Sequence, residues 1–410
     1  MPTAKFNLLL HLREADWLDR RRVRAYAALL ALASLVVLAN SFHKAMGSGG
    51  TDFLAFWGAG HVAAAGEPPA AYDLAVQERV QTGTGSSVWF AFVNPPPFLF
   101  FAAPFGVLPF PLAWIAWVAV TFALWAVTAI RAFPRMWIVV LVFPGALLAA
   151  GHAQTGLLTG ALLVGGVSLV DRRPLLAGAL LGALIIKPHL ALLVPVWLAA
   201  GGRWRAFLAA GASAAGLLVL SLAVFGGETL GAYTAAWAMS AAILDGAGPD
   251  FYLRMVSFYA QACLLLPRIP ALAIHGGLAA FAGAFVVSGS RRFRQDGLAS
   301  GALMLCATAL ASPYLFNYDL PFLIVPVLWL VQQGLCEGFR QFEKLALVGV
   351  YAAPFATRAA ALPMGINLMP IASSVLLWLV WSRIYASGEA TSVPKRHVRD
   401  KTGTRRRTVH

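Results

Sequence analysis

Long apolar runs recur along almost the whole of this 410-residue chain, separated by short connections in which basic residues cluster. Many of the runs reach the roughly 20 residues that an α-helix needs to cross the apolar core of a bilayer. Charged residues make up 12% of the chain, whereas a soluble domain carries about 25%. The pattern therefore predicts an all-α polytopic membrane protein and leaves no room for a large soluble domain.

The apolar runs predict about twelve transmembrane helices, within a range of roughly 10 to 13. Residues 95–108 are also apolar and are interpreted as a re-entrant or interfacial segment. The run 174–201 is interrupted at Lys187-Pro188-His189 and predicts a hairpin of two short helices, because proline disfavours helical backbone in the residue before it. The predicted spans are 25–43, 110–131, 135–151, 154–170, 174–187, 189–201, 205–225, 260–288, 296–312, 319–334, 344–361 and 365–386.

The basic residues between the spans predict the orientation of the protein. Cytoplasmic loops carry an excess of Lys and Arg, and placing every basic cluster inside puts both termini in the cytoplasm, in a bacterial-type inner (plasma) membrane. The predicted parts are a cytoplasmic N-terminus at 1–24, one transmembrane domain at 25–386 and a basic, disordered cytoplasmic tail at 387–410. The net charge of +14 therefore predicts attraction to anionic membrane lipid rather than binding to nucleic acid.

Two outer loops are long, at about 44–94 and 226–254. In the first loop, aromatic and apolar residues recur at helical spacing from Phe53 to Val62. This pattern predicts a short amphipathic helix that lies on the membrane, and a second one is predicted at 69–81.

The predicted topology places most polar side chains outside the basic loops at the extracytoplasmic ends of the spans. Ionisable residues at membrane depth are costly and usually functional. We therefore predict a polar cavity that opens to the outer face. The residues at this end are Asp52, Asn94, His152, Gln154, Lys187, His189, Asn317, Asp319 and Arg358.

No local motif identifies a reaction. Walker A, HExxH and GxSxG sequences are absent, and the three cysteines lack the spacing of metal ligands. We therefore predict no metal-binding residues and no cofactor, and leave a metal requirement of the reaction open. Any chemistry must come from scattered polar residues that meet in the folded protein.

Several short motifs follow one another between about residues 50 and 325. The segment 52–60 reads Asp-Phe-Leu-Ala-Phe-Trp-Gly-Ala-Gly. The later motifs are Gly66-Glu67-Pro68, Tyr72-Asp73, Asn94-Pro95-Pro96, Gly151 to Gly156, Gly178 to Lys187-Pro188, Ser312-Pro313-Tyr314 and Tyr318-Asp319. Their order and spacing resemble glycosyltransferase family 87, which contains the polyprenol-phosphate-mannose-dependent mannosyltransferases of the GT-C membrane class. Two departures are Asn94, where that family usually has tyrosine, and His152-Ala153, which interrupt its Gly-Gln-Asn block.

The resemblance implies a GT-C fold and an inverting glycosyltransferase. A sugar, expected to be mannose, would move from a polyprenyl-phosphate donor to a hydroxyl of a lipid or glycan acceptor on the extracytoplasmic face. It also implies that the aspartate of the first outer loop, Asp52, is the general base. Such a reaction needs one carboxylate to take the proton of the attacking hydroxyl. The alternative role for Asp52 is to cap the helix that begins at Phe53.

The remaining candidates are assigned by what their side chains can bind. A departing phosphate needs cationic groups, and the candidates are Lys187, Arg254 and Arg358. Lysine can instead extend to the interface, and arginine can pair with a lipid headgroup. The residues predicted to line the sugar and acceptor pocket are Asn94, His152, Gln154, His189, Tyr318, Asp319 and Asp73. Their alternatives are roles at helix ends or as interfacial anchors, and for Asp73 a helix cap.

A transporter or flippase of a lipid-linked substrate is the competing interpretation, because it would also have about twelve helices and a polar cavity. Transporters often have repeated halves and polar residues near the bilayer midplane. This sequence has no repeat that we detect, and its polar residues gather at one face. The sequence therefore favours an enzyme.

Overall fold

The computed structural model describes residues 8–246 and 248–392, and within them every regular element is a helix. The first part of the chain forms α1 (Leu8–Glu14), α2 (Arg20–Ala45), α3 (Phe53–Ala64), η1 (Pro68–Tyr72), α4 (Leu74–Thr82), η2 (Pro96–Phe98), α5 (Leu99–Gly106), α6 (Phe110–Ala132), η3 (Pro134–Met136) and α7 (Trp137–Leu141). The middle part forms α8 (Pro144–His152), α9 (Gly156–Leu169), α10 (Pro174–Gly182), η4 (Ala183–Ile186), η5 (Pro188–Ala191), α11 (Val194–Ala200), α12 (Trp204–Asp245), α13 (Pro249–Arg254) and α14 (Phe258–Cys263). The last part forms α15 (Arg268–Arg292), α16 (Gly297–Ala311), η6 (Asn317–Leu323), α17 (Ile324–Glu337), α18 (Glu343–Met364) and α19 (Met369–Ser392).

All twelve predicted spans coincide with helical segments, so the all-α prediction is confirmed. In the described part of the chain, six helices are long and apolar enough to cross a membrane. The pair 134–141 and 144–152, which bends by 49°, makes a seventh if it counts as one span. The other apolar helices are shorter, at 10–17 residues. The count of about twelve spans stays a prediction.

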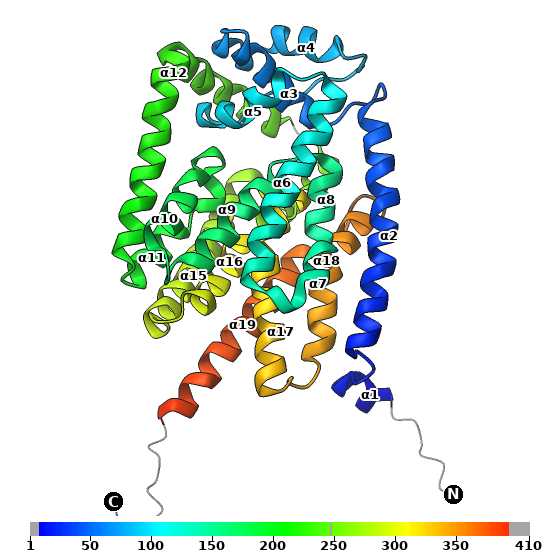
Figure 1. Ribbon diagram of the computed structural model, residues 1–410, viewed down its shortest axis with the longest axis vertical. Helices are drawn as coiled ribbons and strands as arrows, with labels where there is room; N and C mark the ends of the chain where they lie inside the picture. Colours follow the sequence, from blue (N-terminus) through cyan, green and yellow to red (C-terminus); the bar gives the residue numbers. More distant parts are fainter. Residues whose placement is uncertain (1–7, 247, 393–410) are drawn as a thin grey trace, which may run out of the picture.

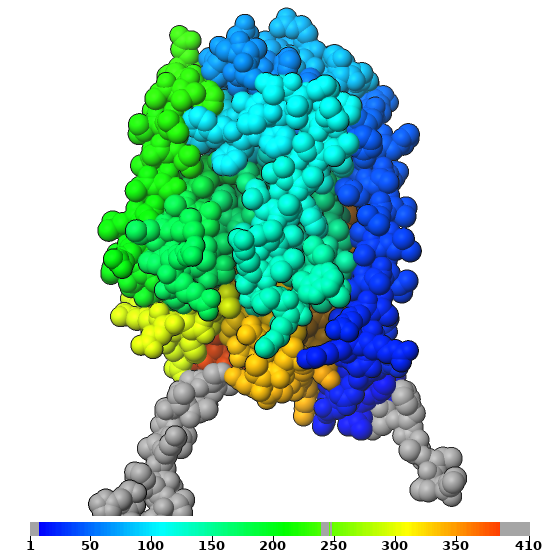
Figure 2. Space-filling model, viewed as in Figure 1, coloured from blue at the N-terminus to red at the C-terminus, as the bar shows by residue number. Residues whose placement is uncertain are grey.

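The helices differ in how much of their surface the protein covers. In α16, all but one of the side chains are buried, so this helix lies in the core. In contrast, α2 buries only Ala27 and Ala45, and it runs along one side of the molecule (Figure 2). Its Leu29 and Leu35 are 66% and 65% exposed. A helix that leaves such apolar side chains uncovered needs an apolar solvent, which a bilayer provides.

The first outer loop contains the two predicted helices, but α3 does not lie on a surface. Eight of its twelve residues are buried, and it packs closely on α5. The contact is close because a side chain on Gly60 would overlap the carbonyl of Ala102, and one on Gly106 would overlap the backbone of Gly60. The prediction of an amphipathic helix on the membrane is therefore wrong for α3. The segment at 95–108 forms η2 and α5, which together are too short to span.

The second outer loop is also different from the prediction, because much of 226–254 is helical. Helix α12 continues to Asp245 across a break at Gly226, which has φ 80° and ψ 162°. Glycine adopts positive φ without a steric penalty, so the chain can change direction there and resume the helix. At the other end of the chain, α19 continues past the predicted end at residue 386 to Ser392. The rest of the predicted tail, 393–410, and residues 1–7 lie outside the described residues.

Helix α1 and the end of α19 lie at the same end of the molecule, and α3 and α4 lie at the opposite end (Figure 1). This arrangement agrees with termini on one side of a membrane. Which side that is stays a prediction.

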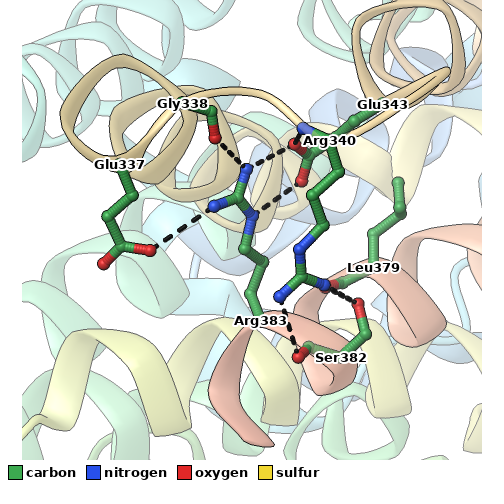
Figure 3. A network of polar contacts seen from close by, with 7 residues as sticks. All are labelled: Glu337, Gly338, Arg340, Glu343, Leu379, Ser382 and Arg383. Carbon is green, nitrogen blue, oxygen red and sulfur yellow. Dashed lines mark hydrogen bonds and ion pairs between the residues drawn. The ribbon is translucent and has the colours of Figure 1, made fainter. Parts of the chain in front are cut away.

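Near the end that holds α1, an ion-pair network ties α17, α18 and α19 together (Figure 3). We define it by Glu337, Arg340, Glu343 and Arg383. Arg383 donates from Nε to Glu343 Oε1 at 2.9 Å, from Nη2 to Glu343 Oε2, and from Nη1 to Glu337 Oε2 at 3.4 Å. The Arg340 amide donates to Glu343 Oε2 at 2.8 Å. Glu343 and Arg383 are 2% and 4% exposed, so the network is a buried clamp between three helices.

Candidate functional site

The turn between α8 and α9 organises the polar residues near the other end of the molecule. Ala153 has φ 48°, which ends α8 in the left-handed conformation. Three residues later, Gly156 begins α9 against η6, where a side chain on Gly156 would overlap the carbonyl oxygen of Tyr318. The turn is therefore held in one place, and it presents Gln154 and Thr155 to two different neighbours.

Asp52 precedes α3 and faces this turn. Its carboxylate makes no capping hydrogen bond to α3, so the cap interpretation finds no support in the structure. Instead, Gln154 Nε2 donates to Asp52 Oδ2 at 3.0 Å. The neighbouring Thr51 Oγ1 donates to the carbonyl of His152 at 3.3 Å. Asp52 is half-buried, so its carboxylate is oriented by the protein without being closed off.

Lys187 lies at the predicted break, where its φ of −150° and ψ of 72° separate η4 from η5. Its ammonium group donates to Asp319 Oδ1 of η6 and, at 3.2 Å, to Thr155 Oγ1. Asp319 Oδ2 also accepts from the amide of Phe316 at 3.1 Å. The Asp319 side chain is fully buried, whereas that of Lys187 is 12% exposed. The carboxylate therefore holds the lysine, and only the lysine retains access to its surroundings.

The ring of Tyr318 connects the two halves. It lies 5.3 Å from Lys187 Nζ and 5.8 Å from the ring of His152, measured to the ring centroid. Asp52 lies within electrostatic range of both Tyr318 and His152. Arg358 of α18, whose side chain is exposed, lies within electrostatic range of His152. We call the group formed by Asp52, His152, Gln154, Thr155, Lys187, Tyr318, Asp319 and Arg358 the polar site.

Two further candidates lie beside Lys187. Asn94 Nδ2 donates to the backbone carbonyl of Ile186 at 3.4 Å, and the backbone carbonyl of Asn94 accepts from the Tyr72 hydroxyl at 2.8 Å. His189 follows Lys187 by two residues, and its buried Nε2 has no hydrogen-bond partner within the described part of the chain. Asn94 therefore fixes the end of the first loop against the segment that carries Lys187.

Asp73 and Arg254 have no described contact with the side chains of the polar site. Asp73 is exposed, and its carboxylate caps α4 by accepting from the amides of Ala75 and Val76 at 2.9 and 3.1 Å. Arg254 is exposed at the end of α13. It comes directly before Met255, which pairs with Phe316 in an isolated antiparallel bridge.

Sequence reasoning did not select Thr155, which contacts Lys187 directly. It is 1% exposed, and the signal for it was its position beside Gln154 at the start of an apolar helix. Ser312 was also passed over as a site residue, although its buried hydroxyl has no hydrogen-bond partner among the described residues.

The polar site has the parts of a proton-transfer and anion-binding site. One carboxylate, Asp52, keeps acceptor capacity beyond its bond to Gln154. The site also contains two cationic side chains, Lys187 and Arg358, and Asp319 holds the first of them in place. A cleft of about 400 Å³ lies elsewhere, between residues of α2, α3 and α6, and the predicted cavity at the polar site stays a prediction.

The sequence model of glycosyltransferase family 87 matches residues 92–313. This range contains the turn at Gln154 and the break at Lys187, whereas Asp52, Asp319 and Arg358 lie outside it. No curated protein and no solved structure matches the chain. With a family match over more than half of its length and at least six apolar helices, the chain belongs to glycosyltransferase family 87 and is an integral membrane glycosyltransferase.

Proposed function

We propose that this protein transfers mannose from polyprenyl-phosphate-mannose to a hydroxyl of a glycolipid or glycan acceptor, with inversion, on the extracytoplasmic face. The observation that carries the proposal is the Asp52 carboxylate. It does not cap its helix, and Gln154 orients it within the polar site. A half-buried carboxylate with free acceptor capacity suits a general base for sugar transfer.

The proposed reaction is a single displacement. The acceptor oxygen forms a bond to the anomeric carbon while the bond between that carbon and the phosphate oxygen breaks. The electron pair leaves with polyprenyl phosphate, and the proton of the acceptor hydroxyl goes to Asp52. One displacement inverts the anomeric centre. Removing the proton as the bond forms is the contribution of a general base, which is worth about 10²–10⁴ in rate.

Lys187 is the proposed ligand of the departing phosphate. An ammonium group has three donors, and Asp319 and Thr155 use two of them. The third is left for a phosphate oxygen. Asp319 is buried, so we assign it as a positioning residue that acts through Lys187. Arg358 is the second proposed cation, because arginine binds phosphate with two parallel hydrogen bonds.

His152, Tyr318 and Asn94 are proposed to shape the sugar and acceptor pocket, because Tyr318 lies against both Lys187 and His152, and Asn94 contacts the carbonyl of Ile186, which precedes Lys187. His189 is proposed to contribute through its unpartnered Nε2. The polyprenyl tail would stay in lipid beside the protein. Asp73 and Arg254 are the weakest of the predicted site residues in this arrangement, since neither lies within the polar site.

The test is a transfer assay with protein purified in detergent. Labelled polyprenyl-phosphate-mannose is supplied with candidate glycolipid acceptors, with and without a metal chelator, and the anomeric configuration of the product is determined by NMR. We expect a mannosylated product of inverted configuration. Transfer from polyprenyl-phosphate-glucose but not from the mannose donor would overturn the sugar assignment. Transbilayer movement of the donor in vesicles, without any transfer, would favour the flippase interpretation instead.

A matched pair of variants tests the base. Asp52→Asn removes the carboxylate of the polar site, and Asp73→Asn removes a carboxylate of the same loop whose described contacts are with its own helix. We expect only the first to slow transfer strongly, by about 10²–10⁴. If Asp52→Asn transfers mannose at the rate of the unaltered protein, Asp52 is not the base.

A further inference from the structure

A cleft of about 700 Å³ lies far from the polar site, between α15 and α19. Both helices pack against α16, and both lie in the half of the molecule that holds α1 (Figure 1). Sites for small molecules typically have volumes of about 300–1,000 Å³. The lining residues are Ala284, Val287, Ser288, Arg291, Arg292 and Tyr385.

Two arginines make the mouth of this cleft cationic. The guanidinium of Arg292 lies over the ring of Tyr385, 4.8 Å from its centroid. Stacking uses the face of the guanidinium and leaves the N–H groups at its edge free to donate. Neither Arg291 nor Arg292 forms an ion pair with any acid whose side chain the structure describes. The cleft therefore presents two positive groups that can bind an anion.

A pair of hydroxyls lies beside the arginines. Ser288 Oγ and the Tyr385 hydroxyl are 2.6 Å apart and share one hydrogen bond. One of the two O–H groups donates in that bond, so the other hydroxyl keeps its hydrogen for a further acceptor. Guanidinium edges next to a free hydroxyl donor suit the oxygens of a phosphate group.

Tyr385, which lines the cleft, belongs to a cluster of aromatic rings on the same two helices. The rings of Trp381 and Tyr385 are 4.0 Å apart, and Trp381 also contacts Phe285 of α15, with 4.3 Å between the ring centroids. On the same two helices, Phe281 and Trp378 are 59% and 66% exposed. A ligand that fits would carry a phosphate at one end and apolar chains at the other.

We propose that the cleft between α15 and α19 binds the phosphate group of a membrane lipid, through Arg291, Arg292 and the hydroxyl pair. Basic pockets between transmembrane helices are typical sites for anionic lipid headgroups. The cleft is separate from the polar site. The proposal therefore does not depend on which donor and acceptor the transferase uses. Two lipids carry the required chemistry, an anionic phospholipid and a polyprenyl phosphate.

The experiment compares two double variants that remove the same charge. Arg291→Gln with Arg292→Gln alters the cleft, and Arg172→Gln with Arg173→Gln alters an exposed basic pair that does not line it. Native mass spectrometry in detergent measures binding of phosphatidylglycerol, of polyprenyl phosphate and of inorganic phosphate. We expect the first variant to bind lipid at least about tenfold more weakly, because it loses both charged donors to the phosphate. We expect the second to bind as the unaltered protein does.

The two lipids then identify the source of the phosphate. Displacement of phosphatidylglycerol by an equal amount of polyprenyl phosphate would assign the site to the carrier lipid, and resistance to displacement would assign it to the phospholipid. Equal loss of lipid in both double variants would overturn the proposal, because general surface charge would then explain binding. Tight binding of inorganic phosphate alone would also overturn it.

A milder variant guards against misfolding. Tyr385→Phe keeps the ring under Arg292 and removes one hydroxyl, and we expect it to weaken lipid binding severalfold while the unfolding temperature without added lipid stays unchanged. Unchanged lipid affinity in this variant, together with unchanged affinity in the arginine variant, would rule out the site.

Discussion

The ion-pair network and the polar site both bring acids and bases together in an apolar protein, but they treat their carboxylates differently. In the network, Glu343 accepts three hydrogen bonds, two from Arg383 and one from the Arg340 amide. In the polar site, Asp52 accepts one described side-chain hydrogen bond, from Gln154. A buried carboxylate most of whose lone pairs are used mainly holds helices together. One that keeps lone pairs free can also take a proton.

The pair formed by Lys187 and Asp319 lies between these two cases. Asp319 is as buried as Glu343 and is satisfied by the lysine and the Phe316 amide. Lys187 keeps a donor and some exposure. The polar site thus contains a small clamp of its own, and we infer that this clamp fixes the cation next to the free carboxylate.

Replacing the free carboxylate has the largest expected effect on activity. Asp52→Asn should lower kcat by about 10²–10⁴, the range for loss of a general base. The unfolding temperature should stay near that of the unaltered protein, because asparagine can still accept from Gln154. Kinetics and a thermal melt in detergent measure both. A large fall in the unfolding temperature would instead show that Asp52, like Glu343, mainly stabilises the fold.

Replacing the satisfied carboxylate should do the opposite. Glu343→Gln leaves Arg383 buried with a weaker partner, and breaking such a pair costs about 3–5 kcal/mol. The protein that remains folded should transfer sugar at the normal rate. The control is Glu14→Gln, which breaks the exposed pair with Arg13 and should cost about 0–1 kcal/mol. Equal melts for the two variants would contradict the assignment of the network as a clamp.

Replacing Lys187 should lower both the stability of the protein and its transfer activity. Lys187→Met leaves Asp319 buried without its cation, so we expect a loss of about 3 kcal/mol in stability together with loss of transfer. Adding Asp319→Leu should restore most of the stability and none of the activity. Unfolding and transfer assays on the single and double variants separate the two effects. If the double variant regains transfer, Lys187 does not bind the phosphate.

The smallest expected effect comes from the packing that supports the polar site. Gly156→Ala would push a methyl group into the Tyr318 carbonyl, and overpacking of this kind costs about 1–3 kcal/mol. The control, Gly277→Ala in α15, meets nothing within 4 Å and should instead stabilise its helix by about 0.5–1 kcal/mol. Melting temperatures that move in the same direction would show that the close approach does not matter.

Much of the fold was predictable because the length of an apolar run and the position of a proline are local signals. Those signals placed the predicted spans on helical segments and located the break at Lys187. They also gathered Asp52, Gln154 and Asp319 at one end, since helices that alternate in direction return to the same face.

What the sequence could not predict depends on contacts between distant segments. Helix α3 has the composition of a surface helix at a membrane, and only its close approach to α5 makes it a core element. The helix after Gly226 looked like a loop because two glycines end the apolar run there. The sequence also did not identify the ion-pair partner of Lys187, because Asp319 is 132 residues away in the chain.

The turn between α8 and α9 has an evolutionary consequence. Gln154 contacts Asp52, Thr155 contacts Lys187, and Gly156 packs on Tyr318, so three consecutive residues connect three separate segments of the polar site. Inserting or deleting one residue there would move the partner of the base and the partner of the cation together. Descendants of this chain can therefore change their sugar or acceptor through the surrounding loops, while the length of this turn must be inherited unchanged.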